Sequence, residues 1–156
     1  MDEQAYRDLH RLEQAHWWYR GTRQMWQGLL QRYLPQPCGS VLDLGCGSGG
    51  NMRLLHRWGP VTGLDLWHPA LCCCTAGSVV QGQATSLPFA GATFGLVAML
   101  DVLEHVADDV ALLEEARRVC RPGGAVLVLT SAFRFLWSDH DRANRHQRRY
   151  TASELV

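Results

Sequence analysis

Residues 41–51 constrain the fold more than any other part of the 156-residue sequence. They read as a short buried strand, residues 41–44, that runs directly into a turn with Gly45, Gly47 and Gly49 at alternate positions. Glycines let the backbone adopt conformations that a Cβ obstructs, and they expose bare amide groups to a ligand at the start of a helix. The pattern therefore predicts a ligand-binding loop inside a βαβ unit.

Two acidic residues flank this loop. Asp43 lies in the strand just before the first glycine, and Asp65 follows the next short strand, residues 61–64. Asp65 comes about 20 residues after Gly45, the spacing at which a carboxylate meets the ribose hydroxyls of a nucleotide-like ligand. Asp43 would repel the pyrophosphate of a dinucleotide and attract a cationic ligand. An Asp that caps a tight turn beside structural glycines is the alternative interpretation.

With these residues the chain resembles the class I S-adenosylmethionine-dependent methyltransferases, and among them the type-11-like members, from about residue 41 onward. The ligand of such enzymes carries a ribose, an adenine, an ammonium and a sulfonium, so one acid near each end of the site suits its charges. The resemblance implies an α/β fold, a Rossmann-like, doubly wound and mostly parallel sheet in the order 3-2-1-4-5. It also implies S-adenosyl-L-methionine as cofactor and S-adenosyl-L-homocysteine as product.

The resemblance extends the expected cofactor site beyond the loop. Gln83 stands where the family often carries an acid that accepts a hydrogen bond from the adenine amino group, and its amide oxygen can still accept that bond. Trp67 either packs on a ligand ring or lies at the rim without contacting it. The expected cofactor-binding residues are Asp43, Gly45, Cys46, Gly47, Gly49, Asp65, Leu66, Trp67, Gln83, Ala84, Leu100 and Asp101.

A second departure from the family pattern precedes the fourth expected strand, residues 94–100. Gly95 stands where an Asp commonly follows the Phe, and that Asp helps to order the preceding loop. The departure predicts a looser loop.

His105 is the candidate catalytic base. It lies just past the fourth expected strand, at the end where ligands bind in open parallel sheets, and its imidazole titrates near neutral pH. Methyl transfer from a sulfonium is an in-line displacement, in which a base helps when the acceptor is a hydroxyl or a protonated amine. In the alternative interpretation, Glu104 and His105 only hold the next helix and the cofactor loop.

A metal site is a weaker alternative and is not favoured. Asp101, Glu104 and His105 are hard ligands within one turn, and His140 or His146 could complete a divalent site. The spacing is similar to the metal-binding segment of small-RNA 2′-O-methyltransferases and of some quinone-pathway O-methyltransferases.

Apolar residues recur every three and four positions over residues 3–14 and 18–33, which predicts two N-terminal helices. We expect residues 1–38 to form a helical cap over the active site and residues 39–156 to form the cofactor-binding core. The remaining expected elements are a helix over 52–58, a helical turn over 69–75, a strand over 78–81, a helix after Asp108 with Val110, Leu113, Ala116 and Val119 inward and residues 121–124 at its end, and a strand over 125–130.

The acceptor side is predicted from two segments. Aromatic rings gather between the N-terminal helices, where packing at a helix junction is the alternative, and arginines gather after the fifth strand, where a solvated basic loop is the alternative. Arginine forks suit a carboxylate or phosphate on the acceptor. The expected acceptor contacts are Trp17, Trp18, Tyr19, His146, Arg149 and Tyr150.

A capping box at Thr151 and Glu154 predicts that a helix begins near the end of the chain. A complete family domain continues with two more strands, so we expect the C-terminal strands to be missing and the chain to be truncated. An exposed fifth strand would then allow the protein to form oligomers.

Composition narrows the function further. The chain has 15 basic and 15 acidic residues, a balance that makes nucleic acid an unlikely partner, and it has no Lys for a Schiff base or a Walker-type phosphate loop. Three of six cysteines are adjacent at residues 72–74, which favours reduced thiols over zinc or disulfides. No signal sequence and no bilayer-spanning run is seen, so a cytoplasmic location without a membrane span is expected.

The expected function is the transfer of a methyl group to an O, N or C atom of a small-molecule acceptor that is quinone-, lipid- or glycan-like, with or without an anionic group. Gln83, Gly95 and the missing strands motivate an alternative, a non-catalytic or impaired cofactor-binding homologue. A nicotinamide-dependent oxidoreductase is less favoured, because Asp43 opposes the pyrophosphate and a catalytic Tyr-Lys pair needs a Lys.

Overall fold

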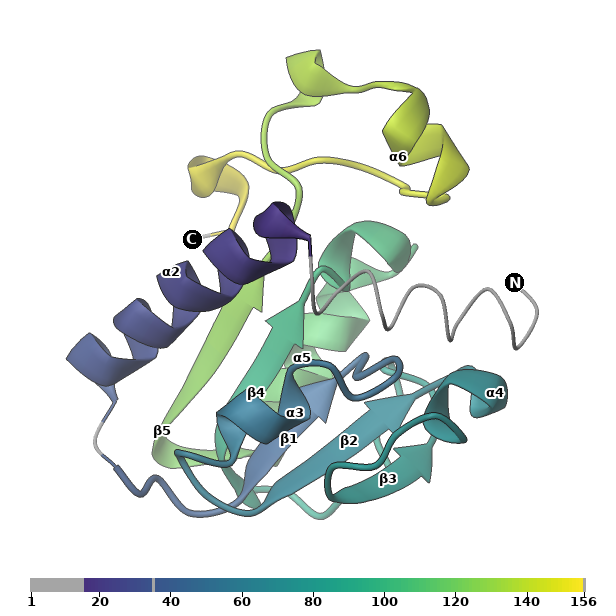
Figure 1. The fold of residues 1–156 in the computed structure, drawn as a ribbon. Coiled ribbons are helices and arrows are strands. Elements are labelled where there is room, and N and C mark those ends of the chain that lie inside the picture. Colours follow the sequence, from purple (N-terminus) through teal and green to yellow (C-terminus); the bar gives the residue numbers. More distant parts are fainter. Residues whose placement is uncertain (1–15, 35, 156) are drawn as a thin grey trace.

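The computed structural model describes residues 16–34 and 36–155 (Figure 1). Its centre is a five-stranded sheet in the order β3-β2-β1-β4-β5, and every neighbouring pair is parallel. The strands are β1 (Val41–Leu44), β2 (Val61–Asp65), β3 (Ser78–Gln81), β4 (Phe94–Leu100) and β5 (Cys120–Leu129). This order confirms the predicted Rossmann-like, doubly wound α/β fold. The expected helix over residues 3–14 lies outside the described residues.

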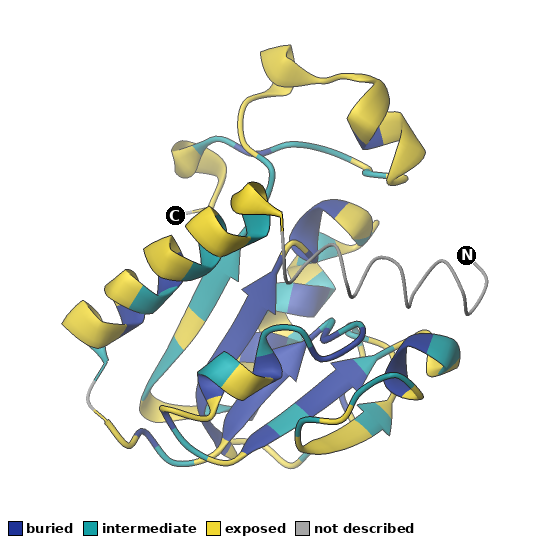
Figure 2. Ribbon diagram, viewed as in Figure 1, coloured by how far each residue is buried: buried dark blue, intermediate teal, exposed yellow. Residues whose placement is uncertain are grey.

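The two central strands form the middle of the core. Every residue of β1 and of β4 is buried, as Figure 2 shows in dark blue, because helices cover both faces of the sheet. Alternate residues of each strand face opposite layers: Leu96 and Ala98 belong to one apolar cluster, and Val97 and Met99 to the other. The core is therefore complete on either side of β1 and β4.

The helices divide between these two layers. Helices α2 (Trp17–Tyr33), α3 (Met52–Leu55) and α4 (His68–Leu71) place buried side chains in one cluster, and α5 (Asp109–Val119) places its own in the other (Figure 1). The α2 helix buries Trp26, whose ring lies 6.3 Å from that of Trp58, and Leu30. The predicted second N-terminal helix is thus present, packed along the face of the sheet. A role as a cap over the active site stays a prediction.

Helix α5 begins as predicted but faces the core differently. The side chain of Asp108 accepts a hydrogen bond from the Ala111 amide at 3.0 Å, which caps the helix. The buried face is Leu112, Ala116 and Val119, whereas Val110 is exposed. The prediction was right for Ala116 and Val119, which are buried, and wrong for Val110, and it missed Leu112, because several spacings of three and four fit the same apolar residues.

Two predicted boundaries were also wrong. The helix after the glycine loop ends at Leu55 instead of residue 58, because the chain tightens into hydrogen bonds three residues apart, such as Trp58 N to Leu55 O. Strand β5 begins at Cys120 instead of residue 125. Residues 121–124, expected only to end α5, form a bulge in β5 where the pairing shifts between Phe94 and Leu96.

Gly95 is required by packing, and the looser loop predicted from its replacement of an Asp stays a prediction. A Cβ at this position would lie 1.7 Å from the carbonyl oxygen of Cys38. The Gly95 amide also donates a hydrogen bond to the Ser40 carbonyl at 2.8 Å. The segment before β1 therefore crosses directly against the start of β4, and only glycine fits beneath it.

Beyond β5 the chain leaves the sheet in a C-terminal segment, residues 131–155, drawn at the top of Figure 1. A bridge between Ala132 and Tyr150 closes its base. It holds η2 (Arg134–Leu136), α6 (Asp139–Ala143) and η3 (Ala152–Glu154), and the predicted capping box is present at Thr151 and Glu154 of η3. Among the described residues, no helix is long and apolar enough to cross a membrane.

Candidate functional site

The glycine loop lies at the carboxyl end of β1, between β2 and β4, where the strand order reverses. Ligands of open parallel sheets bind at this switch point. Gly45, Gly47 and Gly49 all have positive φ, at 78°, 53° and 82°. The amides of Gly45 and Cys46 donate to the Leu64 carbonyl at 2.7 and 3.0 Å, which fastens the loop to β2. The loop is therefore held in a conformation that side chains disfavour.

The three glycines have different surroundings. A Cβ at Gly45 would lie 2.4 Å from Cγ2 of Val102, and one at Gly49 would lie 2.3 Å from Sγ of Cys74. A Cβ at Gly47 would have no heavy atom within 4 Å. Two of the glycines thus permit close packing below the loop, and Gly47 presents bare backbone to open space, as a ligand cradle requires.

The two predicted acids lie on either side of this loop. Asp43 is 2% exposed at the end of β1. Asp65 accepts hydrogen bonds from the Gly47 amide at 2.8 Å and the Trp67 amide at 2.9 Å. Burial, and after it the negative charges of Asp43 and Asp65, raises the pKa of the Cys46 thiol, so Cys46 stays neutral. The negative field around the loop therefore comes from the two carboxylates and suits a cation.

The remaining predicted cofactor residues lie at the same edge of the sheet. Leu66 and Trp67 follow β2 and are exposed, and Gln83 follows β3 in a turn that the Ser86 amide closes on the Gln83 carbonyl. Ala84 is half-buried, Leu100 ends β4, and exposed Asp101 follows it with a φ of 59°. The fold brings all twelve positions to the carboxyl ends of β1 to β4. Their roles as ligands of a cofactor stay a prediction.

Glu104 has a structural function in this edge. It is buried, and its carboxylate accepts hydrogen bonds from the Thr130 hydroxyl at 2.8 Å and from the Ser131 amide and hydroxyl at 3.1 Å. It thereby ties the turn η1 (Leu103–His105) to the end of β5. Because both of its oxygens serve these bonds, it suits a metal poorly. Across residues 16–34 and 36–155, no three His, Cys, Asp or Glu side chains are grouped to hold a metal ion.

His105 is exposed beside this anchor, and its ring centroid lies 4.7 Å from that of His146. Partial burial, followed by the charge of His146, lowers the pKa of His105 below its ordinary value. The imidazole is therefore neutral at neutral pH, the form that accepts a proton. This state fits the predicted base and does not by itself establish catalysis.

The predicted acceptor residues of the C-terminal segment are bound to internal acids. Arg149 donates two hydrogen bonds to the fully buried Asp141 carboxylate, from Nε at 2.7 Å and from Nη2 at 2.9 Å. Nδ1 of His146 lies 2.9 Å from the same carboxylate. These contacts, the Arg149 bonds first, hold the pKa of Asp141 well below its usual range. Tyr150 is buried and donates its hydroxyl hydrogen bond to Asp109 at 2.9 Å. In this structure Arg149 and Tyr150 secure the segment, and acceptor contacts for them stay a prediction.

The predicted aromatic contacts lie on the first turn of α2. Trp17 is 72% exposed and Trp18 is 53% exposed, with their rings in edge contact at 5.9 Å, and Tyr19 is half-buried. The alternative, packing at the junction with the expected helix over residues 3–14, involves residues outside the described ranges. Nε of Arg23, one turn further on, donates to Oδ1 of Asn51 at 3.0 Å. This contact links α2 to the end of the glycine loop.

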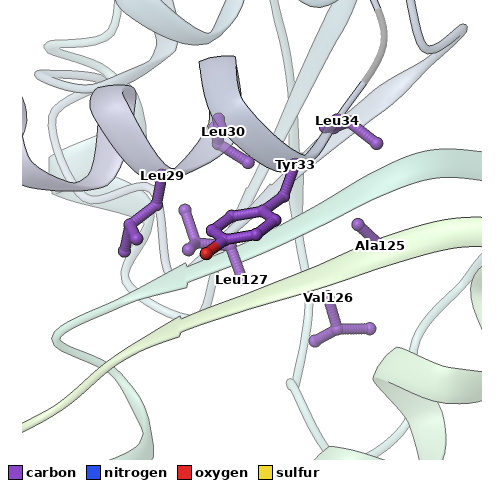
Figure 3. Close-up of a pocket in the computed structure, with 7 residues that line it drawn as sticks. All are labelled: Leu29, Leu30, Tyr33, Leu34, Ala125, Val126 and Leu127. Carbon is purple, nitrogen blue, oxygen red and sulfur yellow. The ribbon is translucent and has the colours of Figure 1, made fainter.

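Sequence reasoning missed Arg23, Asn51 and Asp141, and no local signal could have found them. Arg23 and Asn51 are 28 residues apart, and Asp141 resembles any acid in a polar stretch until Arg149 and His146 fold around it. A small apolar groove between α2 and the second half of β5 is also new (Figure 3). Its lining residues are Leu29, Leu30, Tyr33, Leu34, Ala125, Val126 and Leu127.

Comparisons with known proteins agree with this geometry. The Methyltransf_11 family, described as "Methyltransferase domain", matches residues 42–128, more than half of the chain. A probable S-adenosylmethionine-dependent methyltransferase of Mycolicibacterium smegmatis is 30% identical over 129 residues, which are 80% of this chain and 49% of that protein. A ubiquinone/menaquinone biosynthesis C-methyltransferase of Desulfotalea psychrophila is 34% identical over 119 residues, 70% of this chain and 48% of that protein.

Solved structures share the fold. A chain of the complex between the Haloferax volcanii Trm112 methyltransferase activator and a putative methyltransferase aligns with a TM-score of 0.76 at 22% identity, over 97% of this chain and 70% of its own. The PH0226 protein of Pyrococcus horikoshii aligns with a TM-score of 0.68 at 27% identity, over 78% of this chain and 58% of its own. The chain spans about half the length of the curated relatives described above. Through the family match, supported by the sheet order and the glycine loop, the chain belongs to the type-11 family of class I S-adenosylmethionine-dependent methyltransferase domains.

Proposed function

We propose that this domain binds S-adenosyl-L-methionine over Gly47 and transfers its methyl group to a small-molecule acceptor. The observation that carries the proposal is the open backbone of Gly47 between two carboxylates, Asp43 and Asp65. A dinucleotide would bring its pyrophosphate against these acids, whereas the ammonium and sulfonium of S-adenosylmethionine are attracted by them. The same observation disfavours a nicotinamide-dependent oxidoreductase.

The residues present fit this cofactor. Asp65, at the end of β2, would accept hydrogen bonds from the ribose hydroxyls in exchange for those it now accepts from the Gly47 and Trp67 amides. The Gln83 side-chain oxygen would accept a hydrogen bond from the adenine amino group. Asp43 would lie nearest the cationic end. When bound, S-adenosylmethionine supplies an activated methyl carbon for in-line displacement, so the work of the chain is to align the acceptor and exclude water.

His105 would take the proton from a hydroxyl or ammonium acceptor, since its lowered pKa keeps the imidazole neutral and its ring is exposed at the carboxyl edge. Support for a class of acceptor comes from comparison only. Matched relatives are named as a ubiquinone biosynthesis O-methyltransferase, a demethylmenaquinone methyltransferase and a norajmaline N-methyltransferase. A ring-containing small molecule, methylated at O, N or C, is the shared chemistry.

Calorimetric titration of S-adenosylmethionine and S-adenosylhomocysteine into the protein tests the proposal. We expect saturable binding that Asp65→Asn weakens about tenfold or more, because the neutral amide loses charge-assisted hydrogen bonds to the ribose. Glu114→Gln is the matched control, since Glu114 is an exposed carboxylate on α5. Absence of binding to the unaltered protein would favour the non-catalytic alternative, and a spectral shift with NADH would favour the oxidoreductase.

A further inference from the structure

An open cavity of about 680 Å³ lies in the C-terminal segment, between residues 134–137 and residues 147–149. Its lining residues are Arg134, Trp137, Gln147, Arg148 and Arg149. Among the described residues, three arginines, one tryptophan and one glutamine line this space, and no acidic residue does. Arginine forks bind planar anions, and an indole packs against rings.

Two of the three arginines are fixed in place. Arg149 is held by Asp141, and Arg148 donates to Asp109 at 2.8 Å and to the Ala107 carbonyl at 2.7 Å. Arg134 differs, because its side chain is 73% exposed and its ion pair is with the partly exposed Glu154. An exposed ion pair contributes little stability, so Arg134 can exchange Glu154 for an anionic ligand at small cost.

The cavity adjoins the edge of the sheet where the candidate base lies. The backbone amide of Gln147 donates a hydrogen bond to the backbone carbonyl of Glu104 at 2.6 Å, and Glu104 directly precedes His105 in the chain. His146, the neighbour of Gln147, contacts the His105 ring at 4.7 Å. The lining residue Gln147 therefore follows His146 directly in the chain, and His146 connects this part of the segment to the candidate base.

We propose that this cavity binds the anionic end of an aromatic methyl acceptor, with its carboxylate or phosphate on Arg134 and its ring against Trp137. The proposal rests on the proposed function and narrows it, because it selects planar acids from the possible acceptors. Arg148 and Arg149, each paired with a carboxylate, form part of the cavity wall, while Arg134 makes the direct contact. A neutral ring of the same shape could not replace Glu154 as the partner of the Arg134 guanidinium group.

Fluorine NMR titration with 4-fluorobenzoate, without S-adenosylmethionine, tests the site directly. We expect saturable line broadening that Arg134→Gln weakens about tenfold, the effect of losing a charge-assisted pair. Arg142→Gln is the matched control, because Arg142 lies in the same segment, is 70% exposed and pairs with Asp139 on the surface. The neutral 4-fluorobenzamide should bind at least about tenfold more weakly than the benzoate.

Absence of binding by both 4-fluorobenzoate and 4-fluorophenyl phosphate, equal anion binding by Arg134→Gln, or equal binding of the benzamide and the benzoate would each overturn the proposal. A parallel titration with 4-fluorophenyl phosphate distinguishes the two anions, and the tighter binder names the group. Because S-adenosylmethionine is left out of these titrations, a negative result for the cavity does not affect the S-adenosylmethionine titration, which tests the proposed function separately.

Discussion

At the scale of the residue, the glycines of the loop differ in what surrounds them: Gly47 is open to a ligand, whereas Gly45 and Gly49 are packed. Its neighbours Gly45 and Gly49 have Val102 and Cys74 directly against them, whereas Gly47 has open space where a side chain would project. Gly45 is therefore required by packing, whereas Gly47 is required only if a ligand lies on its backbone. Substitution can distinguish those reasons, since one should affect binding and the other folding.

Gly47→Ala should weaken S-adenosylmethionine binding about tenfold while costing about 1 kcal/mol of unfolding free energy, the strain of alanine at positive φ. Gly45→Ala should cost about 2 to 3 kcal/mol more, because its methyl group meets Val102. Calorimetry and chemical denaturation measure the two effects. Normal cofactor affinity in Gly47→Ala would show that the ligand does not lie on this backbone.

At the scale of the element, three buried or half-buried acids order the C-terminal segment and attach it to the rest of the domain. Glu104 binds the start of the segment, Asp109 binds Tyr150 and Arg148 near its end, and Asp141 holds its two halves together through Arg149. A segment with little apolar burial is thus ordered by charge-assisted hydrogen bonds. Its stability should depend on pH.

The pKa of Asp141 is lowered in the folded state from an ordinary value of 3.8. Its contribution to stability is therefore present above pH 3.8 and lost as the pH falls toward the lower folded-state pKa. Asp141→Asn should destabilise the segment by about 3 kcal/mol at neutral pH, because Arg149 loses its buried partner, and this difference should shrink below about pH 4. Hydrogen exchange of residues 131–155 measures it.

Asp139→Asn provides the control, since Asp139 lies in the same helix and its side chain is 94% exposed. We expect a change within about 0.5 kcal/mol for this variant. A pH-independent difference between the wild type and Asp141→Asn would contradict the assignment of the ion pair.

At the scale of the whole molecule, the sheet ends on two unlike edges. Strand β3 spans four residues and β5 spans ten, and β5 pairs only with β4 among the described residues. Val126 is exposed on β5, where it lines the apolar groove of Figure 3. A long apolar edge strand is a template for pairing with another chain.

We therefore expect this chain to self-associate through β5, and Val126→Arg to shift it toward the monomer. Light scattering after size-exclusion chromatography, over a range of concentrations, measures the mass. Val79→Arg on the β3 edge is the control, because Val79 is similarly exposed. A monomer at all concentrations, or an equal effect of both variants, would contradict this prediction.

The sequence was most informative where structure is local. The strands β1 to β4 follow from apolar runs, and the ligand loop follows from glycines beside Asp43 and Asp65, because a buried strand and a tight turn each restrict the residues that can form them. The start of β5 could not be predicted, since its bulge depends on pairing with β4. For the same reason the packing of Gly95 against Cys38 carried no local signal.

By itself, then, the sequence determined the parallel α/β architecture and the position of the cofactor loop, whose signals lie within a few neighbouring residues. Only the tertiary structure decided the partners of Arg149, Glu104 and Arg23, because residues far apart in the chain meet there. It also made Arg149 and Tyr150 anchors of the C-terminal segment and left Arg134 exposed at the cavity. Hydrogen-bond partners depend on distance in space, which residue spacing does not specify.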